Sequence, residues 1–164
     1  GDLTHFIKYC NDPIATRDQF WKPIDTLQAQ KRINQACTAP MTEAEGQIAI
    51  ALRDTDVMIG HCYFHIDHEA QAELCIILPQ QYHDLGYGLE TLSALLHYGF
   101  HDLNLHRICS VVACDNINNI KNLENLYFRK EVENKLALKH GGVWLDNYEY
   151  GLLSNEYFER HITA

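Results

Sequence analysis

The 164-residue sequence lacks any apolar run approaching the roughly 18 residues that cross a membrane, and its N-terminus lacks a basic-then-apolar signal pattern. We therefore expect a cytoplasmic protein with no membrane partner. Internal repeats, low-complexity tracts and linkers are also missing, so a single domain over residues 1–164 is expected.

Positive charge is scarce, because 13 Lys and Arg residues stand against 22 Asp and Glu residues. The resulting net charge of −9 argues against general nucleic-acid binding. It is compatible with a cationic substrate such as an amine, through weak electrostatic steering.

The six cysteines form no CxxC pair, and most stand in apolar runs, so we expect buried thiols rather than disulfides. Among the ten histidines, His61 and His65 should share one face of a strand, with Asp67 and His68 following. Metal-ligand spacings such as HxH and HExxH are absent, so we expect a solvated sheet face and no metal site.

Hydrophobic periodicity predicts an α+β protein. Helices are expected near residues 3–10, from the Asp25-Thr26 cap to Ala36, after Gly88, and at 117–126. Strands are expected at 47–52, 57–66, 72–78 and 107–112, with a closing hairpin of 131–139 and 145–152. The sheet should be antiparallel first, and a βαβ crossover should make 72–78 and 107–112 parallel.

The most informative segment runs from Glu73 to Phe100, where an apolar strand leads through Gly86-Tyr87-Gly88 into a helix. Such a turn directs unpaired backbone N–H groups at the positive end of the helix dipole, and its glycines let a phosphate approach closely. No Lys or Arg lies between Gln80 and Tyr98. Loop 83–88 should therefore bind a phosphate or diphosphate through backbone dipoles, with help from His83.

Four collinear segments resemble the GNAT superfamily of N-acetyltransferases, and more narrowly its Rim-type branch, which acetylates ribosomal-protein N-termini, with spermidine acetyltransferases nearby. The resemblance covers about residues 12–156. The matching segments are Glu73 to Glu90 with Gly86-Tyr87-Gly88, Leu103 to Arg107, Asn116 to Phe128, and Gly141 to Leu153 with Gly141-Gly142-Val-Trp144.

The resemblance implies a mixed, mostly antiparallel sheet with helices on both faces, and acetyl-CoA as cosubstrate. It implies that the backbone at 76–78 pairs with the pantetheine arm, and that an N–H near Ile77 or Leu78 stabilises the oxyanion. Asn116 also fits a helix N-cap, and Asn119 stands where the family has a serine. The implied cofactor-binding residues are Ile76, Ile77, Leu78, His83, Asp84, Leu85, Gly86, Tyr87, Gly88, Asn116 and Asn119.

Glu73 is the candidate catalytic base, because acetyl transfer needs a neutral amine and most amines are protonated at pH 7. The alternative is a strand-edge carboxylate that pairs with a nearby base or with the backbone. Trp21 and Asp146 are candidate acceptor contacts, which otherwise serve packing and a hairpin turn. The acceptor is expected to be a protein N-terminus, a polyamine or another small amine, and the sequence is compatible with a homodimer.

Several positions depart from the family pattern. The loop opens with His83 in place of Gln or Arg, Leu123 replaces the tyrosine acid of many relatives, and Tyr127 replaces a helix-ending glycine. Tyr127 is expected to be structural, or else a relocated acid. The family's usual first strand also has no match. The alternative function is accordingly a catalytically inactive CoA-binding sensor or interaction module of the same fold.

Overall fold

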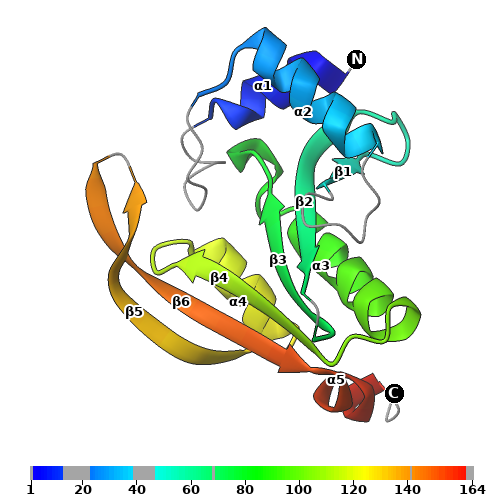
Figure 1. Ribbon diagram of the computed structural model, residues 1–164, viewed down its shortest axis with the longest axis vertical. Helices are drawn as coiled ribbons and strands as arrows, with labels where there is room; N and C mark the ends of the chain where they lie inside the picture. The colour runs from blue at the N-terminus through cyan, green and yellow to red at the C-terminus, as the bar shows by residue number, and fades with distance from the viewer. Residues whose placement is uncertain (1, 13–22, 39–46, 68, 141, 162–164) are drawn as a thin grey trace.

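The computed structural model describes residues 2–12, 23–38, 47–67, 69–140 and 142–161 (Figure 1). In these ranges no helix is long and apolar enough to cross a membrane. The elements are α1 (Asp2–Cys10), α2 (Thr26–Thr38), β1 (Gln47–Ala51), β2 (Met58–Ile66), β3 (Gln71–Ile77), the 3-10 turn η1 (Gln80–Tyr82), α3 (Tyr87–His97), the π-helical turn η2 (Tyr98–Asp102), β4 (Arg107–Ala113), α4 (Ile117–Asn125), β5 (Arg129–His140), β6 (Val143–Leu153) and α5 (Ser154–His161).

The six strands form one sheet in the order β1-β2-β3-β4-β6-β5. Every neighbouring pair is antiparallel except β3 and β4, which are parallel and joined through α3. The predicted α+β class and the βαβ crossover are therefore confirmed. The hairpin is longer than predicted, and η1 lies where the sequence suggested only a loop.

Helices cover both faces of the sheet, and the alternation of side chains along β3 explains how. Leu74 and Ala72 join a core with the leucines of α3 and with Leu123 of α4. Cys75 and Ile77 point the other way, into a core with α1 and α2. A strand covered on both faces needs apolar residues at successive positions, which accounts for the run from Leu74 to Leu78.

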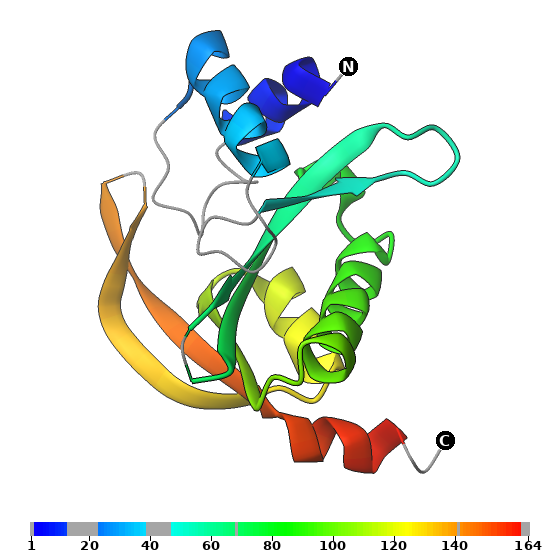
Figure 2. The same ribbon diagram turned by 45° about the vertical axis from the view of Figure 1, so that its right-hand side comes forward.

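The predicted cap of α2 is confirmed as a reciprocal pair. Asp25 Oδ1 accepts from the Gln28 amide at 2.8 Å, and Gln28 Oε1 accepts from the Asp25 amide at 3.3 Å. The cap fixes where α2 begins, and Ala29 one turn later is fully buried against the sheet. In Figures 1 and 2, α1 and α2 lie together at the end of the molecule opposite α5.

The expectation of a solvated face for His61 is wrong. His61 is 1% exposed, and its Nδ1 is hydrogen-bonded to the Tyr9 hydroxyl at 2.8 Å. Burial, and secondarily the charge of Arg32, lower the pKa of His61 to about 3, so the ring is neutral at physiological pH. The sequence pattern placed His61 on the correct strand, but α1 covers that part of the face. All six cysteines are free thiols, of which Cys10, Cys62 and Cys75 are buried and Cys37 is exposed.

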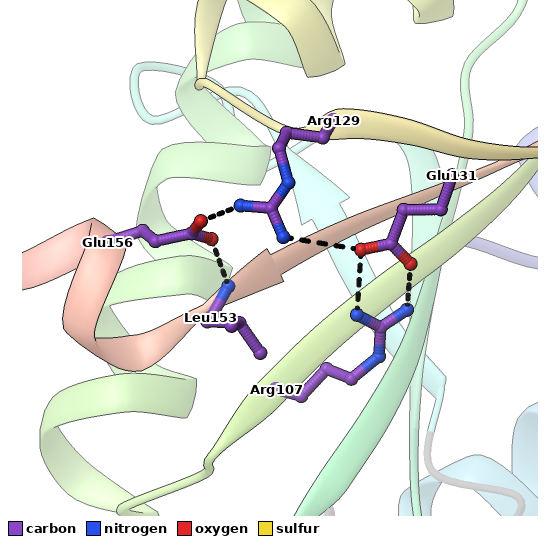
Figure 3. A network of polar contacts seen from close by, with 5 residues as sticks. All are labelled: Arg107, Arg129, Glu131, Leu153 and Glu156. Carbon is purple, nitrogen blue, oxygen red and sulfur yellow. Dashed lines mark hydrogen bonds and ion pairs between the residues drawn. The ribbon is translucent and has the colours of Figure 1, made fainter.

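Helix α5, which the sequence analysis did not predict, is fixed to the sheet by charged side chains (Figure 3). Arg107 binds Glu131 through two hydrogen bonds, of 3.0 and 2.5 Å, and Arg129 contacts both Glu131 and Glu156. A side chain on Gly151 would lie 2.5 Å from Arg107 Nη1. The network therefore lies directly over Gly151, and it ties β4, β5 and α5 together.

Tyr127 ends α4 in a left-handed conformation, with φ of 66°. The amide of Phe128 donates to the Leu123 carbonyl at 3.0 Å, and the amide of Tyr127 donates to Glu124 at 3.0 Å. These two bonds form a Schellman motif, whose left-handed position usually holds glycine. Tyr127 is half exposed and stacks under Arg160, with the guanidinium carbon 4.2 Å from the ring centre. The structural interpretation of Tyr127 agrees with this geometry.

We predict that Tyr127→Gly is more stable than Tyr127→Ala by about 1 kcal/mol, because a Cβ is disfavoured at positive φ. Both variants lose the ring, so their difference isolates the backbone. Urea unfolding measures the two free energies. Ala94→Gly in α3 provides the control. Because residues of a right-handed helix favour alanine over glycine, glycine should there be the less stable of the two residues. Equal stability of the two Tyr127 variants would contradict the prediction.

Candidate functional site

The site begins where β3 and β4 separate. The two strands pair only through Gln71 with Arg107, Ala72 with Ile108 and Glu73 with Cys109. Beyond Glu73, β3 stays paired with β2 while β4 stays paired with β6. Figure 1 shows the two strands diverging from this point. The ends of β3 and β4 are therefore split, and no strand among the described residues pairs with the β3 backbone there on its β4 side.

A cleft of about 460 Å³ occupies this region, between the end of β3, the loop into α3, and α4. All of the predicted cofactor-binding residues line it except Leu85 and Tyr87. The remaining lining residues were not predicted from the sequence: Gln80, Tyr82, Leu89, Asp115, Ile117, Asn118, Lys121, Asn122 and Asn125. Most belong to α4, where Asn118, Asn122 and Asn125 share one face at helical spacing, a signal that was available from the sequence.

The turn before α3 has the geometry of an anion site. Gly86 is the N-cap of α3 with φ of 86°, and no atom lies within 4 Å of where its side chain would be. Its carbonyl accepts the first helical hydrogen bond, from Glu90, at 2.9 Å. The N–H groups of the first turn have no acceptor within the helix and stand at the positive end of its dipole. An anionic group has open access to them.

Gly88 lets α3 and α4 approach each other. A side chain at Gly88 would lie 2.8 Å from Nδ2 of Asn122 and 3.8 Å from Cδ1 of Leu78. The glycine turn therefore faces the middle of α4 directly across the cleft. The second glycine of the sequence motif thus serves close packing, while the first serves the left-handed turn.

His83 anchors the loop to the strand. Its Nε2 donates to the carbonyl of Leu78 at 2.8 Å. This bond closes the turn through η1 and fixes the position of Asp84, which has φ of 56°, and of Gly86. His83 thus has a structural contact that the sequence analysis did not anticipate, in addition to lining the cleft.

Asn116 caps α4, as its position suggested. Its Oδ1 accepts from the amide of Asn119 at 3.2 Å, so the cap holds the first turn of α4 at the edge of the cleft. Both side chains line the cleft. Leu123, at the place of the family tyrosine, is 0% exposed and packs in the core, so this position supplies no proton.

Glu73 lies at the point where β3 and β4 part. It is half-buried and stands opposite His65 on β2 and Cys109 on β4. By the alternation along β3, it is on the face covered elsewhere by α1 and α2, and it does not line the cleft itself. Burial, and then the charge of Glu73, raise the pKa of the Cys109 thiol. The thiol therefore stays protonated and is a poor nucleophile.

The two candidate acceptor residues have different outcomes. Trp21 lies outside the described residues. Asp146 stands opposite a bulge in β5, where Oδ1 accepts from the Leu136 amide at 2.8 Å and Oδ2 accepts from Lys135 at 3.0 Å. These bonds lower the pKa of Asp146. Its carboxylate thus holds the bulge of the hairpin.

In the described ranges, no group of His, Cys, Asp and Glu is arranged to hold a metal ion.

We predict that Asp146→Ala accelerates hydrogen exchange at the Leu136 amide, whereas Asp146→Asn retains much of the protection because its carbonyl oxygen can still accept. NMR exchange rates at pH 6 measure this. Because folding lowers the pKa of Asp146, its stabilisation is complete above about pH 4 and is lost below it. Unchanged exchange in Asp146→Ala would contradict this role of the carboxylate.

Known proteins with similar sequences share this architecture. The family model described as acetyltransferase (GNAT) domain matches residues 1–129. The "uncharacterized N-acetyltransferase p20" of Bacillus licheniformis is 33% identical over 159 residues, which cover 95% of this chain and 89% of that protein. The "uncharacterized N-acetyltransferase YnaD" of Bacillus subtilis is 33% identical over 109 residues, which are 66% of this chain and 64% of that protein, just under two thirds of its length.

Solved structures agree on the fold. A GNAT-family acetyltransferase from Bacillus anthracis has a TM-score of 0.82 at 24% identity, covering 94% of this chain and 90% of that one. The spermidine N-acetyltransferase of Vibrio cholerae, solved with CoA and spermine, has a TM-score of 0.81 at 20% identity, covering 96% and 93%. With the family model matching most of the chain, this protein belongs to the GNAT family of acetyltransferases.

Proposed function

We propose that this protein is an acetyl-CoA-dependent N-acetyltransferase, in which a primary amine attacks the thioester directly. The observation that carries the proposal is the split between β3 and β4. A cleft with a glycine turn at one end opens beside this split, and the carboxylate of Glu73 lies at the last residue pair before the two strands part. This arrangement suits a long cosubstrate with a diphosphate at one end and a thioester at the other.

In the proposed complex the diphosphate lies at the N-terminus of α3, near Gly86. The pantetheine arm follows the backbone of residues 76–78, with Asn116 and Asn119 of α4 on its other side. These contacts use peptide groups of β3 that have no partner strand, which is why the split is needed. A backbone N–H near Ile77 or Leu78 then donates to the carbonyl oxygen as negative charge develops there.

The acetyl group passes directly to the amine. A nitrogen–carbon bond forms, the carbon–sulfur bond breaks, and CoA leaves as a thiolate. Glu73 accepts the proton that the amine must lose, either directly or through water. Thiols have a pKa near 8.5, so the thiolate leaves without an acid at the position of Leu123. A covalent step on Cys109 is not needed.

The acceptor is a primary amine, such as a protein N-terminus, a polyamine or another small amine. The Vibrio cholerae enzyme of similar fold is a spermidine N-acetyltransferase, and the sequence motifs resemble the Rim-type branch, so both classes belong in a screen. The excess of acidic residues, with a net charge of −9, favours approach of a cationic amine to either kind of site.

Isothermal titration with acetyl-CoA, followed by CoA, tests the cosubstrate. We expect micromolar binding of both, and acetyl transfer to at least one member of a panel that includes N-terminal peptides and spermidine. Binding without transfer to any amine would support the sensor alternative. No binding at hundreds of micromolar would overturn the proposal.

Replacing Glu73 tests the proposed base. We expect Glu73→Gln to lower kcat by about 10²- to 10⁴-fold, because the amine must then lose its proton to solvent. The remaining rate should rise with pH as more of the amine becomes neutral. Acetyl-CoA affinity should stay unchanged, since Glu73 does not line the cleft. Glu69→Gln, in the exposed turn before β3, serves as the control. Full kcat of Glu73→Gln at every pH would eliminate this role.

A further inference from the structure

We infer that Lys121 of α4 supplies the positive charge that binds the diphosphate of CoA. This inference rests on the proposed function, since it assigns a residue within the same cleft. It places the cationic part of phosphate recognition on the helix across the cleft from the glycine turn. The loop itself contains no Lys or Arg.

The charges of the cleft single out Lys121. Among the described residues that line it, Lys121 is the one Lys or Arg side chain. Asp84 and Asp115 also line the cleft, so the acidic side chains there oppose an incoming anion. The ring of His83 already donates to the carbonyl of Leu78. Among the described lining residues, the dipole of α3 and the charge of Lys121 are therefore the positive contributions that favour a diphosphate.

The packing of α3 on α4 brings the helix that carries Lys121 close to the glycine turn. Asn122 comes so close to Gly88 that a side chain there would lie 2.8 Å from its Nδ2. Lys121 precedes Asn122 and lines the same cleft as Gly86 and Gly88. Its flexible four-carbon stem lets the ammonium group reach an anion held at the N-terminus of α3.

Lys121 also differs from four other basic residues of the chain, whose charges are held in ion pairs. Arg107, Arg129, Lys130 and Lys135 are each bound to carboxylates. Within the described part of the chain, the ammonium group of Lys121 makes no such ion pair, and the residue is exposed at the mouth of the cleft. It is thus available to an anionic ligand without breaking an existing contact.

Titration of the full chain with CoA and with 3′-dephospho-CoA tests the inference. We expect Lys121→Gln to raise the Kd of both ligands by about 10-fold or more, as for loss of a hydrogen bond to a charged group. Lys121→Arg should restore binding to within about threefold, since it keeps the charge. Binding by the wild type should also weaken more steeply with added salt than binding by Lys121→Gln.

Arg53→Gln, in the exposed turn between β1 and β2, is the matched control and should bind like the wild type. Gln has nearly the helix propensity of Lys, and circular dichroism with thermal unfolding verifies the fold of each variant. If the wild type binds CoA and Lys121→Gln binds within twofold of it, the inference fails while the proposed function stands. If Lys121→Gln loses affinity for CoA but not for 3′-dephospho-CoA, then Lys121 recognises the 3′-phosphate. That result also overturns the inference. Failure of the wild type to bind CoA overturns both.

Discussion

The site depends on the short pairing between β3 and β4. Three residue pairs hold the strands together, and each strand then keeps its other neighbour, β2 or β6, while the two separate. Unpaired peptide groups inside a sheet are unfavourable unless something else satisfies them. The split therefore provides a place where an extended ligand is able to complete the hydrogen bonding of a strand. The cleft and Glu73 both take their positions from it.

Two helices turn this split into a bounded site. Gly86 gives α3 its sharp entry, and Gly88 allows Asn122 of α4 to approach, so the N-terminus of α3 faces the polar side of α4. The apolar side of α4, with Leu123, packs into the core behind it. The same residues thus join the architecture of the core to the shape of the cleft. Polar groups gather where the two helices leave space between them.

The charged side chains separate into structural and functional groups. Arg107, Glu131, Arg129 and Glu156 connect two strands to α5, and Asp146 with Lys135 holds the bulge of the hairpin. Asp146 illustrates why residue type alone does not identify an acceptor contact, because a carboxylate in a hairpin has a backbone amide to accept from. His61 makes a similar point, since α1 packs over it and leaves it buried.

The sequence by itself determined the class of fold, the crossover, the glycine turn and the family, because these follow from local periodicity, turn chemistry and the order of motifs. It also fixed the cap at Asp25, which depends on neighbours a few residues away, whereas the left-handed end of α4 at Tyr127 became clear only in the structure. Only the tertiary structure decided that His61 is buried, that His83 bonds to Leu78, and that Lys121 and Gly86 line the same cleft. These facts depend on contacts between segments that periodicity does not position relative to one another. Long-range packing of helices on the sheet sets them, and no local pattern encodes that packing.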